Sequence, residues 1–164
     1  KPRMGKDRLF GQILEKESNG EQVTILSIDE AHLLSEEALV DLRLLLSTGE
    51  NNLKLILAGQ NGLHTTLSRS SLADLVNRIT VRLHLAPLTM DQTLCYLDHR
   101  ITRTGGTAKL IDDAAKEKIH EYTGGVPRAI NNLATISLIQ GAAKKQKRIT
   151  EALVDDAAAE MRIL

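Results

Sequence analysis

Residues 23–30 read VTILSIDE, a short apolar run that ends in two adjacent acids. The run is nearly continuous and rich in β-branched residues, which is typical of a strand buried on both faces. A second run of the same kind, LKLILA at residues 53–58, lies downstream. Because only a short helix fits between the two runs, the sequence predicts a strand, a helix and a strand of a parallel α/β sheet.

The segment between these runs has the features of that helix. Ser35 is placed to cap its amino terminus. Glu36 and Glu37 in the first turn suit the positive end of the helix dipole, and Gly49 ends the helix. The apolar stripe of the helix consists of Leu39, Leu42, Leu45 and Leu46.

Three further segments belong to this first half. An amphipathic stretch near residues 7–17 predicts a helix, and residues 61–77 predict one or two short helices. Residues 79–85, ITVRLHL, alternate apolar and polar side chains, as a strand with one wetter face does. Ala86-Pro87 then marks a boundary. We therefore expect a partial α/β core over residues 1–86.

The second half is predicted to be helical throughout. Thr89 and Gln92 are spaced as a capping box, and Pro127 stands where a helix begins its first turn. We therefore expect a small all-helical domain over residues 87–164. Its four helices are predicted near residues 90–103, 112–122, 127–143 and 151–162.

The composition excludes several classes of protein. The 164 residues carry 21 Lys and Arg against 21 Asp and Glu, which excludes a globally basic nucleic-acid binder but leaves room for a local charged patch. A single cysteine, Cys95, excludes an internal disulfide, and we expect it to be a small buried apolar side chain. No apolar run approaches the roughly 20 residues that span a bilayer, and we expect a cytoplasmic protein.

The two acids that follow the first strand are the sharpest chemical signal. Asp29 and Glu30 stand at the carboxyl end of a parallel strand, where open α/β sheets bind ligands. In a nucleoside triphosphatase the first acid holds Mg²⁺ and the second polarises the attacking water. The alternative is an acidic turn that precedes a capped helix.

Two other segments carry polar residues at places where chemistry is expected. Gln60 and Asn61 follow the second strand, so one of them should lie close to the acids and could orient a water. Alternatively the pair is a polar turn that caps the next helix, which suits Asn61 better. Arg128 stands in the first turn of a helix after Gly124-Gly125-Val126-Pro127, where the helix dipole disfavours a cation. This placement suggests contact with phosphate.

The order of these motifs resembles a known family. LSIDEAHLL, LKLILAGQ, LVNRITVRLHLAPL and GGVPRAINNLA follow one another as in AAA+ ATPases of the ExeA/TniB type, which include ATPases of bacterial secretion pathways and of transposition systems. The resemblance runs from about Leu9 to Met161. It implies a P-loop NTPase sheet domain followed by a helical lid, the use of ATP and Mg²⁺, and an ATP-dependent homo-oligomer.

The resemblance also assigns roles to individual residues. Residues 25–30 are similar to a Walker B strand, and Arg82 is a weaker candidate than Arg78 for the arginine finger. The implied roles are Mg²⁺ binding for Asp29, catalytic base for Glu30, sensor 1 for Gln60, a finger acting on the neighbouring subunit for Arg78, and sensor 2 for Arg128. For Arg78 the alternative is an ion pair with Asp74, one helical turn earlier.

One element of the family pattern is missing. A P-loop reads G-x-x-x-x-G-K-[ST], and the one Gly-Lys pair here, Gly5-Lys6, is followed by Asp7. We therefore expect the chain to be the carboxyl-terminal portion of a longer protein, and we expect these residues alone to be inactive.

Several functions remain open. The stretch RAINNLA at residues 128–134 resembles the transposon-associated members of the family, and this resemblance favours a transposition regulator that binds DNA and a transposase. The alternatives are a type II secretion ATPase that acts with an inner-membrane component, and a scaffold of the same fold that binds no nucleotide. The letters DEAH at residues 29–32 also occur in helicases, but those need two large sheet domains. The basic turn at residues 144–148 is either a solvated loop or a contact with phosphate backbone.

Overall fold

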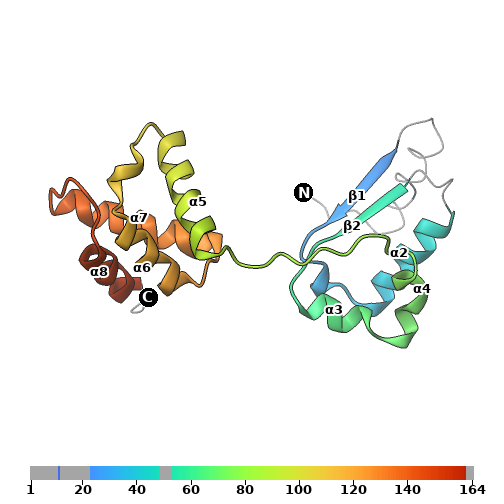
Figure 1. Ribbon diagram of the computed structural model, residues 1–164. Helices are drawn as coiled ribbons and strands as arrows, with labels where there is room; N and C mark the ends of the chain where they lie inside the picture. Colours follow the sequence, from blue (N-terminus) through green and yellow to red (C-terminus); the bar gives the residue numbers. More distant parts are fainter. Residues whose placement is uncertain (1–10, 12–22, 49–52, 162–164) are drawn as a thin grey trace. The chain divides into compact units, whose positions relative to one another are not determined.

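The computed structural model describes residue 11 and residues 23–48 and 53–161. The chain divides into two compact units, residues 1–83 and residues 84–164 (Figure 1). Apart from residue 11, which is helical, the helix predicted near residues 7–17 lies outside the described residues, as does the helix end predicted at Gly49. Among the described residues no helix is both long and apolar enough to cross a membrane.

The first unit contains a two-stranded parallel sheet. β1 (Thr24–Ile28) pairs with β2 (Leu53–Leu57), so that Ile28 lies opposite Leu57. The connection between them contains a 3₁₀ turn, η1 (Ala31–Leu33), and a helix, α2 (Glu36–Thr48). The predicted strand, helix and parallel strand are therefore confirmed (Figure 1).

Two short α-helices follow β2, as predicted, with a 3₁₀ turn between them: α3 (Gly62–Leu67), η2 (Ser70–Leu72) and α4 (Ala73–Val76). Two ion pairs tie them to α2: Arg69 to Glu36 at 2.7 Å and Arg43 to Asp74 at 2.9 Å. The amino terminus of α2 is capped by Ser35, whose Oγ accepts a hydrogen bond from the N–H of Ala38 at 3.2 Å.

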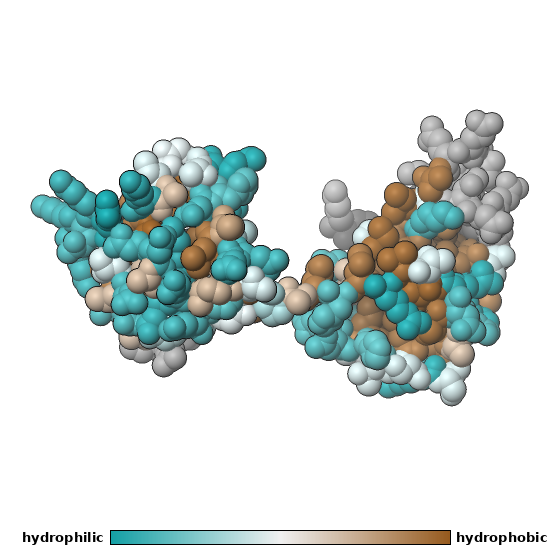
Figure 2. Space-filling view, in the orientation of Figure 1, coloured by the Kyte–Doolittle hydropathy of each residue, from teal (hydrophilic) through white to brown (hydrophobic). Residues whose placement is uncertain are grey.

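Only one face of this sheet is covered by the described residues. Leu26 and Leu55 pack on that face against buried leucines of α2, η2 and α4. On the other face Ile25 and Ile56 are 64% and 51% exposed, and Figure 2 shows exposed apolar side chains gathered on this unit. The prediction that both strands are buried on both faces is therefore wrong for the part of the chain that the structure describes.

The strand predicted at residues 79–85 is not formed either. The segment is irregular, and Val81, Leu83 and Leu85 are 69%, 84% and 91% exposed. A strand requires a neighbour that bonds its backbone N–H and C=O groups. Within residues 23–48 and 53–161 the sheet contains only β1 and β2, and neither pairs with this segment.

The second unit is helical, as predicted. Its helices are α5 (Met90–Arg103), η3 (Ala108–Leu110), α6 (Asp113–Thr123), α7 (Pro127–Ala143) and α8 (Glu151–Met161). The capping box is present: Thr89 Oγ1 accepts from the N–H of Gln92, and Gln92 Oε1 accepts from the N–H of Thr89. Cys95 is exposed on α5, so the prediction that it is buried is wrong.

The core of this unit joins all four α-helices. It is aliphatic throughout and includes Leu97, Ile101, Ile111, Ala115, Ile119, Ile130, Leu133, Ile149, Leu153 and Val154. A close backbone contact fixes where α5 and α7 begin: Leu88 N–H donates to the carbonyl of Gly125 at 2.8 Å. Gly125 has φ +76°, and a Cβ there would lie 2.0 Å from the Leu88 carbonyl oxygen. The glycine is therefore required at this contact.

Candidate functional site

The two acids form a bulge at the carboxyl end of β1. Ala58 donates its N–H to the Ile28 carbonyl at 2.9 Å and accepts from the N–H of Ala31 at 2.8 Å. In a regular parallel ladder, a residue bonds the two residues on either side of its partner. With residue 29 as the partner of Ala58, the Ala58 carbonyl would accept from the N–H of residue 30. Asp29 and Glu30 thus occupy the place of one residue, a β-bulge, and such bulges commonly redirect side chains next to active sites.

Glu30 has a backbone conformation that is rare for its residue type. Its φ of 52° and ψ of 33° are left-handed, which costs a non-glycine residue on the order of 1–2 kcal/mol. Asp29 Oδ1 accepts a hydrogen bond from the N–H of Glu30 at 2.8 Å, and this bond helps to hold the turn. Both acids are exposed, so their carboxylates are available to a ligand.

Gln60 lies beside this bulge, as the parallel arrangement of the strands predicts. The link between them is His32, a residue of η1 whose side chain is 15% exposed. Its Nδ1 accepts a hydrogen bond from the backbone N–H of Gln60 at 3.3 Å. The same Nδ1 lies 3.4 Å from Oε2 of Glu30. The imidazole therefore stands between the second acid of β1 and the residue that follows β2.

Gly59 makes this close approach possible. A Cβ at residue 59 would lie 3.0 Å from the backbone N of His32 and 3.4 Å from its Nδ1. A larger residue would push η1 away from the end of β2 and lengthen the bond between His32 and Gln60. Sequence reasoning identified neither His32 nor Gly59 as part of the site. The available signal was a histidine that directly follows the acidic bulge, opposite a glycine that ends the next strand.

Both candidate arginines have exposed side chains. Arg78 lies just after α4, is exposed, and its side chain has no hydrogen bond or ion pair with another described residue. Its alternative partner, Asp74, is paired with Arg43 instead. Arg128 belongs to the second unit, in the first turn of α7, and its side chain is likewise exposed and unpaired within the described part of the chain.

Asp29 suits a magnesium ion. Mg²⁺ keeps several waters and usually binds one or two carboxylates together with substrate phosphates. Asp29 offers such a carboxylate: it is exposed, and one oxygen is fixed by the N–H of Glu30. No group of three or more metal-binding side chains occurs among the described residues, so a cage made of protein alone is not available there.

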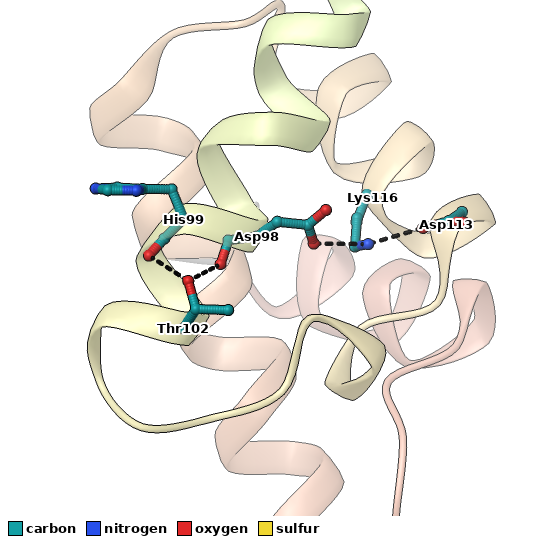
Figure 3. Close-up of polar contacts among 5 residues, drawn as sticks. All are labelled: Asp98, His99, Thr102, Asp113 and Lys116. Carbon is teal, nitrogen blue, oxygen red and sulfur yellow. Dashed lines mark hydrogen bonds and ion pairs between the residues drawn. The ribbon is translucent and has the colours of Figure 1, made fainter.

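The second unit carries a separate polar cluster around Lys116. The Lys116 side chain is only 4% exposed and lies between Asp98 of α5, at 2.8 Å, and Asp113 of α6, at 2.7 Å (Figure 3). Burial lowers the pKa of Lys116, but the hydrogen bonds and charges of Asp113 and Asp98 outweigh this and raise its pKa above 10.5. Hydrogen bonding and charge from Lys116 lower the pKa of Asp113 below 3.8. The cluster ties α5 to α6.

Comparison with known proteins bears on the family of the chain. The family profile AAA_22, described as an AAA domain, matches residues 2–67. The General secretion pathway protein A of Aeromonas hydrophila is 32% identical over 158 residues, which cover 94% of this chain and 29% of that protein. The chain thus spans less than a third of the length of this relative. Together these similarities support an AAA+ ATPase fragment of the secretion-pathway protein A type.

Solved structures agree on the fold. A proline-to-glycine variant of Thermotoga maritima RuvB has a TM-score of 0.71 and 21% identity, covering 94% of this chain and 51% of that chain. Another structure, described as the Thermotoga maritima RuvB Holliday junction branch migration motor, has a TM-score of 0.61 and 22% identity, covering 90% and 48%. At these identities the likeness concerns the fold alone.

Proposed function

We propose that this chain is part of an AAA+ ATPase that acts in a secretion pathway. It supplies the helical lid and the edge of the sheet at which ATP is hydrolysed. In this proposal residues 1–86 belong to the ATPase core and residues 87–164 form the lid. The observation that carries it is the bulge at Asp29 and Glu30, which presents two carboxylates beside Gln60 at the carboxyl ends of two parallel strands. This is the edge at which open α/β sheets bind ligands.

Each residue has a distinct role in this proposal. Asp29 holds Mg²⁺, which when bound offsets charge on the phosphates of ATP. Glu30 takes a proton from the attacking water, and the amide of Gln60 orients that water. Arg128 contacts the nucleotide from the lid, and Arg78 acts on the nucleotide of the neighbouring subunit, which requires assembly into a homo-oligomer. No phosphate-binding G-x-x-x-x-G-K-[ST] occurs in these 164 residues, so we expect activity only in a longer protein that supplies one.

Substitution of Glu30 tests this assignment in the full-length protein. Glu30→Gln keeps the shape of the side chain and removes the base, so ATP binding should persist while turnover falls by about 10²–10⁴. Glu37→Gln is the matched control, because Glu37 is an exposed acid on α2 at which the same change should leave turnover intact. Equal turnover in the Glu30→Gln variant and the wild type would reject Glu30 as the base. Absence of ATP binding in the wild type would favour the nucleotide-free scaffold.

The biological role is a further part of the proposal. The 32% identity to General secretion pathway protein A supports the secretion pathway, with an inner-membrane component as the partner. A transposition regulator that binds DNA and a transposase stays a prediction from the RAINNLA stretch alone. Affinity capture with the full-length protein as bait distinguishes the two, since a secretion role requires recovery of a membrane component of that machinery and a transposition role requires recovery of a transposase.

A further inference from the structure

His32 touches both sides of the candidate site through one ring atom. Its Nδ1 accepts from the N–H of Gln60 at 3.3 Å and lies 3.4 Å from a carboxylate oxygen of Glu30. A ring nitrogen that accepts a hydrogen bond carries no proton, so in this arrangement the proton of the neutral imidazole is on Nε2. A nitrogen in that state cannot donate to Glu30.

The two contacts therefore exclude each other. When Nδ1 accepts from Gln60, the Glu30 carboxylate receives no hydrogen bond from the ring. If Nδ1 instead carried a proton and donated a hydrogen bond to Glu30, the N–H of Gln60 would lose its acceptor and one carboxylate oxygen would be occupied by the ring. The first arrangement is the one that suits a catalytic base beside a water-orienting amide.

The surroundings hold the imidazole close to Gln60. The backbone of η1 is joined to the end of β2 by the bond from the Ala31 N–H to the Ala58 carbonyl at 2.8 Å. Gly59 lets the end of β2 approach the backbone of η1 closely, since any Cβ there would lie 3.0 Å from the backbone N of His32. The Gln60 carbonyl in turn accepts from the N–H of Leu63 at 2.9 Å, so the segment held by His32 leads directly into α3.

We propose that His32 is a positioning residue: by anchoring the Gln60 backbone through Nδ1, it sets the Gln60 side chain beside Glu30 and leaves the Glu30 carboxylate unblocked. The effect on catalysis rests on the ATPase function proposed above, whereas the anchoring itself does not. Removal of the acceptor should free the segment after β2, so that Gln60 orients water less well. Nucleotide affinity should be unaffected, since the proposed role of His32 is to anchor Gln60 and not to bind the nucleotide.

Two substitutions of nearly equal size test the proposal. His32→Leu fills the space but offers no acceptor, whereas His32→Asn offers an amide oxygen close to the position of Nδ1. In residues 1–164, amide hydrogen exchange measured by NMR should be about 10-fold faster at Gln60 in the Leu variant and near wild type in the Asn variant. The Ala58 amide, bonded to Ile28, is the internal reference that reports an intact strand end.

The second measurement is steady-state ATP hydrolysis by the full-length protein. His32→Leu should lower kcat about 10-fold with an unchanged KM for ATP, and His32→Asn should restore kcat. Unchanged exchange at Gln60 in the Leu variant would overturn the anchoring, and faster exchange with unchanged kcat would overturn the positioning role. If the wild-type protein hydrolyses no ATP, the proposed function fails, while the exchange measurement still decides whether His32 anchors Gln60.

Discussion

The left-handed backbone of Glu30 allows us to predict how substitutions of this one residue change the stability of the fold. Glycine adopts φ 52° without steric cost, whereas Glu and Ala do not. Glu30→Gly should therefore be more stable than Glu30→Ala by about 1 kcal/mol, measured by chemical denaturation of residues 1–164. In the full-length protein both variants should lose turnover. Equal stabilities of the two variants would show that the bulge relaxes and stores no strain.

Sequence reasoning located the acids and the amide but not the contacts that join them. Asp29, Glu30 and Gln60 follow strands that can be recognised by composition, so their positions at one sheet edge could be predicted. The extra residue of the bulge could not, because it depends on the exact register between β1 and β2. The contact of His32 with Gln60 depends on that same register.

At the scale of helices, the adjacent glycines before α7 allow a matched test. Both have positive φ, but a Cβ on Gly125 would lie 2.0 Å from the Leu88 carbonyl oxygen, whereas a Cβ on Gly124 meets nothing within 4 Å. Gly125→Ala should therefore cost about 3 kcal/mol or more, because the backbone of Leu88 must move. Gly124→Ala should cost about 1 kcal/mol from backbone strain alone. Denaturant midpoints of the two variants measure the difference, and similar midpoints would contradict it.

The two ion pairs of Lys116, one to Asp98 of α5 and one to Asp113 within α6, allow a prediction of how stability depends on pH. Lys116→Met removes the cation and leaves Asp98, whose side chain is 39% exposed, without its partner, which should cost about 1–2 kcal/mol near pH 7. Asp113→Asn is the control and should stay close to wild type, since the Asp113 side chain is 81% exposed. Thermal melts of the variants measure both effects.

The direction of the pH effect follows from the two pKa shifts. The pKa of Asp113 is lowered, so its contribution is present above pH 3.8 and is lost as pH falls through the folded-state pKa. The pKa of Lys116 is raised, so its contribution is present below pH 10.5 and is lost as pH rises through the folded-state pKa. The difference in free energy of unfolding between wild type and Lys116→Met should thus be constant near neutral pH. It should become smaller at strongly acidic and at strongly basic pH. A gap that narrows between pH 5 and 9 would contradict this.

Helices could be predicted from the sequence where the residues that define them lie within one segment. The capping box at Thr89 and Gln92 and the proline at the start of α7 mark helix starts through contacts inside the helix itself. Residues 79–85 show the limit of such reasoning. Their alternation is typical of a strand, but a strand exists only with a neighbour, and none pairs with them among the described residues. Composition likewise could not reveal that one sheet face is open.

At the scale of the whole molecule, the question is whether Arg78 acts on its own subunit or on a neighbour. The ion pair that would explain Arg78 without a function is not formed, because Asp74 lies 2.9 Å from Arg43. An exposed guanidinium without a partner among the described residues is available to a second copy of the protein. An arginine supplied in trans stabilises charge on the transferred phosphoryl group and contributes roughly 10³–10⁵ in rate in other enzymes.

Mixing two inactive variants of the full-length protein decides between these cases. Arg78→Ala and Glu30→Gln should each be inactive alone, but mixed oligomers contain some interfaces that pair an intact Glu30 with an intact Arg78. ATP hydrolysis should therefore return in part on mixing, at a level set by the mixing ratio. Arg82→Ala, in the same exposed segment, is the control and should remain active alone. Co-assembly without any recovery would rule out action of Arg78 on a neighbouring subunit. Loss of activity in Arg82→Ala alone, with recovery when Arg82→Ala is mixed with Glu30→Gln, would give the role to Arg82.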